Sequence, residues 1–157
     1  MIGPVRGAGE EGTAPPASVL FVCSQNVLRS PVAAELMRRR FGRLVYVESA
    51  GVAAGAEVDA FAVAAMEELG CDISRHRPKT IDALEDMSFD LIVTLTPQAH
   101  HRALELTRTL AVEVEYWPTQ DPSLAQGSRE QRLEEYRALR DALDARLARR
   151  FARPSTG

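Results

Sequence analysis

The sequence predicts a single α/β domain, a three-layer sandwich whose central parallel four-stranded sheet is doubly wound. Two observations lead to this prediction. Short apolar runs rich in β-branched residues recur along the chain, and such runs are typical of strands buried on both faces. Helical patterns stand between these runs, and strands that alternate with helices form parallel sheets. The length of 157 residues fits one domain with a substantial core.

The first strand and the first helix are joined by a short loop. Residues 19–22 form a continuous apolar run, which predicts a buried strand. Pro31 suits the first position of a helix, because its missing N–H would have no partner there. The loop between them, residues 23–30, therefore ends at a helix N-terminus. Free N–H groups and the helix dipole favour an anion at that point.

The middle of the chain continues the alternation. Residues 44–48 are expected to form a strand. Residues 59–69 have helical spacing, and Gly70 is expected to end that helix. Residues 89–95 form a second buried run, which predicts another strand.

The last third of the chain carries clear helix signals. Thr96 is the expected N-cap of a helix that runs to about Leu106. Residues 112–117 alternate between polar and apolar, which predicts a strand at the sheet edge. Ser128 and Gln131 have the spacing of a capping box and are expected to begin the final helix.

We expect the domain to span residues 17–152. Residues 1–16 are rich in Gly, Pro and Ala and lack the apolar stretch of a secretion signal, which predicts a flexible N-terminal tail. Residues 153–157 are expected to be a flexible C-terminus.

Composition limits the classes of function. A net charge of −3 provides no basic surface for nucleic acid, and no apolar run approaches membrane-spanning length. Two cysteines indicate a reducing, cytoplasmic location rather than a disulfide scaffold. We expect no metal site and no cofactor, and a monomer or weak dimer.

Cys23 is the candidate nucleophile. It ends the first predicted strand, and Arg29 follows six residues later at the start of the helix. Positive charge at that helix end stabilises a thiolate, and a guanidinium binds two phosphate oxygens at once. The hydroxyl of Ser30 is placed to donate to the thiolate. The alternative is a buried structural cysteine, but the strand, loop and helix around Cys23 favour catalysis.

These motifs resemble the low-molecular-weight protein tyrosine phosphatase family, which has arsenate reductases of the same fold as relatives. The matching segments, in order, are residues 23–31, 48–51, 74–76, 90–96 and 121–122. The candidate acid Asp121 follows the cysteine in the chain, whereas it precedes the cysteine in the larger tyrosine phosphatases.

The resemblance implies a role for each residue. Cys23 would attack phosphorus and form a phosphocysteine. Arg29 would hold the phosphate oxygens with the backbone N–H groups of the phosphate-binding loop, which comprises Ser24, Gln25, Asn26, Val27, Leu28 and Arg29. Asp121 would protonate the leaving oxygen and then deprotonate the attacking water. Asn26 would adopt a left-handed turn and bond Ser49, with Ser30 as a further supporting residue.

The chain departs from the family pattern at the rim of the loop. Gln25 replaces the usual glycine, and Leu28 replaces a frequent second cysteine. Residues 52–54 and 123–124 lack the aromatic side chains typical of phosphotyrosine-selective members. The substrate is therefore left open between a phosphorylated protein and a small phosphorylated molecule, with phosphotyrosine, phosphoarginine and metabolites all fitting.

Two other functions remain open from the sequence. An arsenate reductase would use the same anion cradle with an external thiol, because residues 94–101 contain no cysteine for an internal dithiol. The second open function is that of a catalytically weak, anion-binding regulatory protein. His76 is expected to be a loop histidine bonded to backbone, beside a basic cluster of Arg75, Arg77 and Lys79 that is either solvated or steers anions.

Overall fold

The computed structural model of the chain describes residues 5–6 and 11–152. The strands are β1 (Val5–Arg6), β2 (Ser18–Cys23), β3 (Tyr46–Gly51), β4 (Leu91–Thr94) and β5 (Glu113–Tyr116). The α-helices are α1 (Arg29–Phe41), α2 (Ala60–Glu67), α3 (Pro97–Leu106) and α4 (Arg129–Arg150). Three short 3-10 turns are η1 (Gly42–Leu44), η2 (Ile81–Ala83) and η3 (Pro122–Leu124).

The strands form one parallel sheet in the order β1-β5-β4-β2-β3. Its four longer strands confirm the predicted parallel four-stranded sheet. The two-residue β1 adds beside β5, where Val5 pairs with Val114, so it covers the edge that was expected at residues 112–117. β2 lies between β4 and β3 in this order, so its carboxyl end lies between the carboxyl ends of those two strands.

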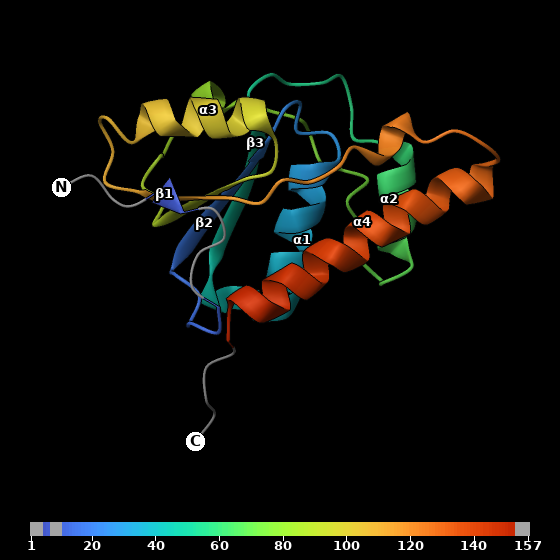
Figure 1. Cartoon of the computed structure of the whole chain (residues 1–157), viewed down its shortest axis with the longest axis horizontal. Helices are drawn as coiled ribbons and strands as arrows, with labels where there is room; N and C mark the ends of the chain where they lie inside the picture. Colours follow the sequence, from blue (N-terminus) through green and yellow to red (C-terminus); the bar gives the residue numbers. More distant parts are fainter. Residues whose placement is uncertain (1–4, 7–10, 153–157) are drawn as a thin grey trace.

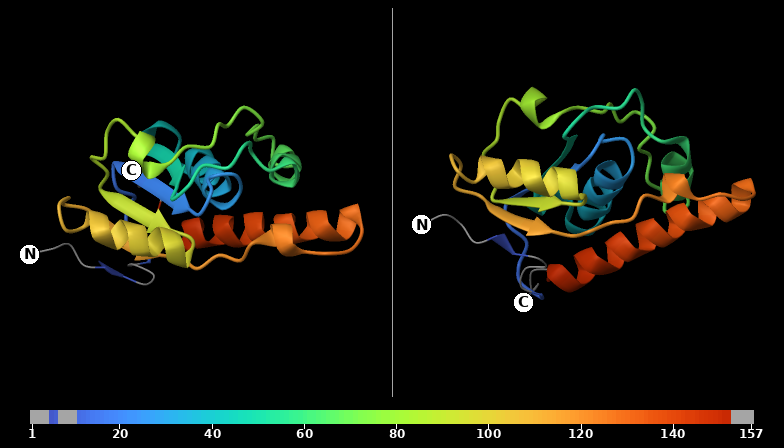
Figure 2. Two further views of the ribbon diagram at one scale, coloured as in Figure 1. Left: turned by 90° about the horizontal axis from the view of Figure 1, so that it is seen from above. Right: turned by 45° about the horizontal axis from the view of Figure 1, so that its top comes forward.

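Helices cover both faces of the sheet, as the doubly wound prediction requires. α3 lies on one face, while α1 and α4 lie on the other and α2 packs against α4 (Figures 1 and 2). Alternate residues of β2 serve the two cores, since Phe21 belongs to the α1 and α4 side and Leu20 to the α3 side. Both side chains are fully buried, which explains why this strand is apolar at successive positions.

Several element boundaries differ from the sequence prediction: α2, β4 and β5 are each shorter than the predicted ranges 59–69, 89–95 and 112–117. α1 begins at Arg29 rather than at Pro31, so the proline occupies a later position in the first helical turn. The strand predicted over residues 44–48 is β3, which spans Tyr46–Gly51. Gly42 has a φ of 54° and ends α1, and the chain makes the η1 turn before it enters the sheet.

The helix caps follow the sequence signals. The side chain of Thr96 accepts a hydrogen bond from Ala99 N at the start of α3. At the start of α4, Ser128 and Gln131 form both hydrogen bonds of the predicted capping box.

The described part of the N-terminal segment contacts the end of α4. Gly12 N donates to Arg149 O, and Ala152 N donates to Thr13 O, both at 2.8 Å. Most of the remaining residues expected to be flexible, including 153–157, lie outside the described residues. In the described ranges, no helix has the length and apolar character needed to cross a membrane.

Candidate active site

The loop that follows β2 turns its carbonyl groups outward. Four N–H groups of residues 52–59 donate to these carbonyls at 2.8–3.1 Å, in the pairs Val52–Cys23, Ala53–Ser24, Gly55–Gln25 and Asp59–Val27. Within the described residues, no acceptor is found for the N–H groups of residues 24–28. With its carbonyls engaged on the outside, the loop has free N–H groups, which form a cradle for an anion.

The thiol of Cys23 lies at the floor of this loop. It is buried, and its Sγ lies 2.9 Å from Ser30 Oγ. Ser30 Oγ accepts a hydrogen bond from Asn26 Nδ2 at 2.8 Å and is 3.3 Å from Ala50 O. The single hydroxyl proton of Ser30 therefore goes either to Cys23 or to Ala50, and a thiolate is the stronger acceptor.

Asn26 holds the shape of the loop. It is fully buried and is the one non-glycine residue of the described chain with positive φ, at 57°. Its Nδ2 also donates to Ser49 Oγ at 3.0 Å, so the hydrogen bond expected from the family resemblance is present. Its Oδ1 accepts from Lys79 N at 3.0 Å. The amide thus ties the loop to β3 and to the segment before η2.

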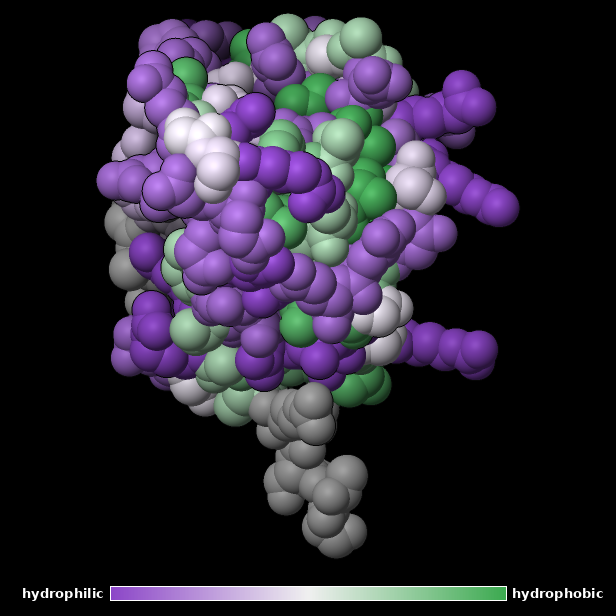
Figure 3. Space-filling model, turned by 90° about the vertical axis from the view of Figure 1, so that its right-hand side faces the viewer, coloured by the Kyte–Doolittle hydropathy of each residue, from purple (hydrophilic) through white to green (hydrophobic). Residues whose placement is uncertain are grey.

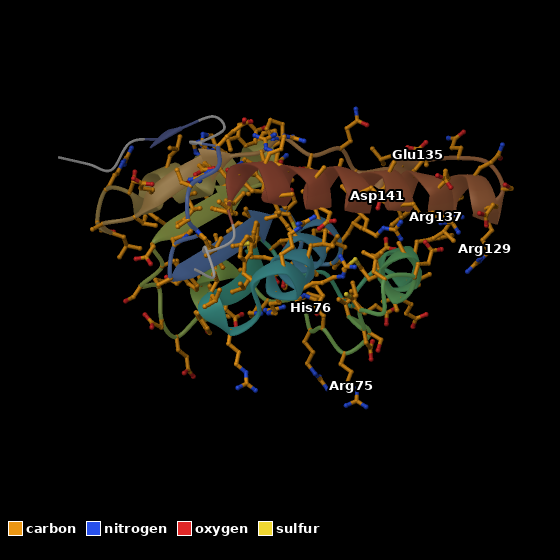
Figure 4. The ribbon with its side chains drawn as sticks, turned by 90° about the horizontal axis from the view of Figure 1, so that it is seen from below. Arg75, His76, Arg129, Glu135, Arg137 and Asp141 are labelled. Atoms are coloured by element: carbon orange, nitrogen blue, oxygen red, sulfur yellow. The ribbon has the colours of Figure 1, made fainter. Side chains whose placement is uncertain are left out.

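His76 adds a second contact to Asn26. Its Nε2 lies 3.0 Å from Asn26 O and 3.1 Å from Asn26 Oδ1. Both atoms are acceptors, so Nε2 carries the proton. Burial lowers the pKa of His76, which keeps the ring neutral near pH 7. The predicted bond to backbone is therefore present, whereas the neighbouring Arg75 extends away from the ribbon (Figure 4).

Arg29 connects the loop to the segment that carries Asp121. Its Nη1 donates to Thr119 O at 3.1 Å, and Thr119 N donates to Leu95 O at 3.0 Å beyond the end of β4. Asp121 is half-buried, and its Oδ1 accepts from the N–H and hydroxyl of Ser123 at 2.9 and 2.6 Å. The bond from Arg29 thus holds the segment that carries Asp121 beyond the carboxyl end of β4, although about ninety positions separate Arg29 from Thr119.

The residues that the family resemblance places at the rim of the loop are aliphatic and polar. Val52 and Leu124 are exposed, Leu124 to 77%, and Gln25 is also exposed. Gly55 packs so closely that a Cβ there would meet the side chain of Val27. Figure 3 shows apolar side chains between hydrophilic ones at the end of the molecule formed by α2 and the start of α4.

Sequence reasoning missed two contacts that support the site. The backbone carbonyl of Thr119 carries no residue-type signal, so its bond to Arg29 was not foreseeable. Asp59 caps α2, accepts from Tyr136 OH at 2.8 Å and donates its N–H to Val27 O. An N-cap aspartate was readable from the sequence, but its partner on α4 was not. Among the described residues, no three His, Cys, Asp or Glu side chains gather as a metal site would require.

Residues 18–153 match the family model described as low molecular weight phosphotyrosine protein phosphatase. The chain belongs to this family. The resemblance inferred from the motifs is thereby confirmed, and the family makes the chain a cysteine-dependent, phosphatase-type enzyme that acts on phosphorylated substrates.

Relatives within the family carry different names. An arsenate reductase of Bacillus subtilis is 33% identical over 129 residues, which cover 82% of this chain and 91% of the relative. The YwlE arginine phosphatase from Geobacillus stearothermophilus is 26% identical with a TM-score of 0.69, covering 84% of this chain and 88% of that one. A YwlE mutant from Bacillus subtilis has 26% identity and a TM-score of 0.68, over 83% and 93% of the two chains.

Proposed function

We propose that this member of the family hydrolyses phosphomonoesters through a phosphocysteine formed on Cys23. The observation that carries the proposal is the 2.9 Å contact between Cys23 Sγ and Ser30 Oγ at the floor of a loop with outward carbonyls. A thiolate is stabilised there by the Ser30 hydroxyl, by the free N–H groups and by the helix N-terminus.

In the first step the thiolate attacks phosphorus and the bond to the leaving oxygen breaks. The N–H groups of residues 24–29 and the Arg29 guanidinium hold the three equatorial oxygens, whose charge they offset. Asp121, in its protonated form, gives its proton to the leaving oxygen. The products of this step are the free alcohol and a phosphocysteine on Cys23.

In the second step water attacks the phosphocysteine. Asp121 is now a carboxylate and takes a proton from that water, while the S–P bond breaks. The Ser30 hydroxyl donates to the departing thiolate, which makes Cys23 a better leaving group. Inorganic phosphate leaves and the thiolate is restored.

Asn26, Ser49 and His76 act as positioning residues in this proposal. The buried Asn26 amide connects Ser30 to β3 and to the segment before η2, and His76 holds both the backbone and the side chain of Asn26. Such a network fixes the geometry of the anion cradle before substrate arrives, so less free energy is spent on ordering it during the reaction.

The substrate is a phosphorylated protein or a small phosphorylated molecule. The mouth offers the aliphatic side chains of Val52 and Leu124 rather than aromatic walls. A mouth without an aromatic wall gives no stacking contact to a phenyl ring, so it does not select phosphotyrosine over phosphoarginine. The arginine phosphatase among the similar structures supports phosphoarginine as a substrate to assay.

Arsenate reduction with an external thiol is the second candidate, because the curated relative is named for it and arsenate fits the same cradle. An internal route through Cys71 is disfavoured by position. The Cys71 thiol interacts with Glu35 and Arg39, which lie six and ten residues along α1 from Arg29. At 1.5 Å per residue these are roughly 9–15 Å from the loop, too far for a disulfide.

The test is hydrolysis of para-nitrophenyl phosphate by wild type, Cys23→Ser and Asp121→Asn. We expect turnover by wild type, no turnover by Cys23→Ser, and a phosphocysteine in acid-quenched wild type by mass spectrometry. Asp121→Asn should lose more activity on phenyl phosphate, whose leaving group is poorer. Wild type that is as inert as Cys23→Ser, with its thiol still titratable, would overturn the proposal. Consumption of arsenate only with an external thiol would then favour reduction.

A further inference from the structure

A groove beside the segment that carries Asp121 has no part in the chemistry above. It encloses about 980 Å³ between residues 117–126 and one face of α4. In Figure 1 this segment (orange) runs alongside α4 before it reaches η3. One wall of the groove therefore belongs to the segment that holds the proposed general acid, and Asp121 itself lines the groove.

Charges are separated along the groove. Glu134 and Glu135 line it near the start of α4, while Arg146 and Arg149 line it near the end of that helix. Between them the lining is apolar and small, formed by Ala138, Leu139, Ala142 and Leu143. A ligand that fills the groove therefore meets an apolar middle and a basic end.

The two arginines at the basic end lack carboxylate partners. Among the described residues, neither Arg146 nor Arg149 forms an ion pair or a side-chain hydrogen bond. Three other arginines of α4 do form such pairs, namely Arg137 with Glu68, Arg140 with Glu68 and Arg150 with Glu115. Arg129 and Arg132, at the start of α4, also form no ion pair within the described residues, but both lie over the ring of Phe61. Along the groove itself, the basic end is thus where positive charge is not already neutralised.

Arg146 presents its guanidinium at the floor of the groove. It is half-buried and lies 5.0 Å from the centroid of the Trp117 ring. Burial, and after it the positive charge of Arg149, lowers the pKa of Arg146, while the carboxylates of Glu115 and Glu11 oppose this shift through space. A partly desolvated guanidinium without a partner gains most from an anionic group supplied by another molecule.

We propose that the groove binds an acidic segment of a phosphorylated protein substrate, with carboxylates on Arg146 and Arg149 while the phosphorylated residue occupies the Cys23 loop. This inference rests on the proposed function and selects a protein rather than a metabolite as the substrate. It uses the continuity of the groove with Asp121 and the charge at its far end.

The structure sets the spacing of such a substrate. Asp121 lies four positions after Trp117, and an extended chain covers at most about 14 Å over those four positions. Counted from Asp121, an extended peptide therefore needs at most about four residues to reach the Arg146 end of the groove. Arg149 lies three residues further along α4, roughly 4.5 Å, which adds one or two peptide residues. Acidic residues four to six positions from the phosphorylated one are therefore expected to matter.

The test uses phosphotyrosyl peptides of one composition. In two of them, aspartates stand four to six residues from phosphotyrosine on the N-terminal or the C-terminal side. In the third, the aspartates are adjacent to phosphotyrosine. We expect one of the two spaced peptides to have a kcat/KM about fivefold or more above that of the peptide with adjacent aspartates, because two partly exposed ion pairs contribute about that much. This preference should be smaller in 0.5 M NaCl, which screens the ion pairs.

The readout is the ratio between peptides, so a general loss of activity cancels. Arg146→Gln with Arg149→Gln should bring the ratio to about one, whereas Arg43→Gln, an exposed arginine on η1, should leave it unchanged. A ratio near one in wild type, or a ratio that survives the double variant, overturns the groove proposal.

Failure of the proposed function gives a different result. Wild type would then turn over no phosphate ester, and the same peptides would be compared by binding. Trp117 is the single tryptophan of the chain and lines the groove, so its fluorescence reports occupancy. Tighter binding of a spaced peptide that is lost in the double variant supports the groove, and equal binding of all three peptides overturns it.

Discussion

Replacement of Asn26 tests the network beneath the nucleophile most directly. Asn26→Ala removes the amide that donates to Ser30 and Ser49 and accepts from Lys79 N. The Lys79 N–H and the buried Ser49 hydroxyl would lose their partners, at about 1–3 kcal/mol each. Alanine at a φ of 57° adds about 1 kcal/mol of backbone strain. The free energy of unfolding should therefore fall by about 3–7 kcal/mol.

Asn26→Gly separates the two contributions. Glycine loses the same hydrogen bonds but accepts the left-handed backbone, so this variant should be about 1 kcal/mol more stable than Asn26→Ala. Both variants should lose about 100-fold in kcat/KM for para-nitrophenyl phosphate, since small displacements of reacting groups have effects of that size. Gln126→Ala, which removes an exposed amide, should change stability by less than about 0.5 kcal/mol.

The assay is urea unfolding followed by fluorescence of Trp117, the only tryptophan of the chain. Two results would refute the reasoning. The first is an Asn26→Ala protein within about 0.5 kcal/mol of wild type, because the buried amide would then carry no net stabilisation. The second is a glycine variant less stable than the alanine variant, because positive φ would then not be the strained feature.

Three further predictions concern titration, oxidation and a buried ion pair. Burial lowers the pKa of His76 below its usual 6.5, so the folded protein resists protonation of this ring. The free energy of unfolding should therefore be highest above about pH 6.5 and should fall as the pH drops through the folded pKa. In a profile of the urea midpoint against pH, His76→Gln should flatten this decline. Peroxide should oxidise Cys23 to sulfenic and then sulfinic acid without forming a disulfide to Cys71. A Cys23–Cys71 disulfide found by peptide mass spectrometry would contradict this prediction. Arg150→Met should lower the free energy of unfolding by about 3–5 kcal/mol, because it leaves the Glu115 carboxylate buried without its cation. Calorimetry should show that the double variant Arg150→Met, Glu115→Gln regains much of the lost stability.

Local signals in the sequence were sufficient for most elements of the fold. The apolar run before Cys23 predicted a fully buried strand, and Thr96 and Ser128 marked the starts of two helices. These features depend on residues within one turn of each other, through side-chain caps and the period of apolar positions, so a short window contains the cause. The order of motifs likewise placed Cys23 and Arg29 on one loop.

Contacts between distant segments were decided only by the tertiary structure. The donation from Arg29 to Thr119 O, the contact between His76 and Asn26 and the pairing of Asp59 with Tyr136 join residues 50 to 90 positions apart.

The sequence by itself determined the strand, the loop and the candidate nucleophile. Only the tertiary structure decided which groups surround Asn26, how the segment that carries Asp121 is tied to the loop through Arg29, and that β1 covers the edge of β5. The physical reason is that sheet order and register set these distances, and both depend on the packing of the whole core rather than on neighbouring residues.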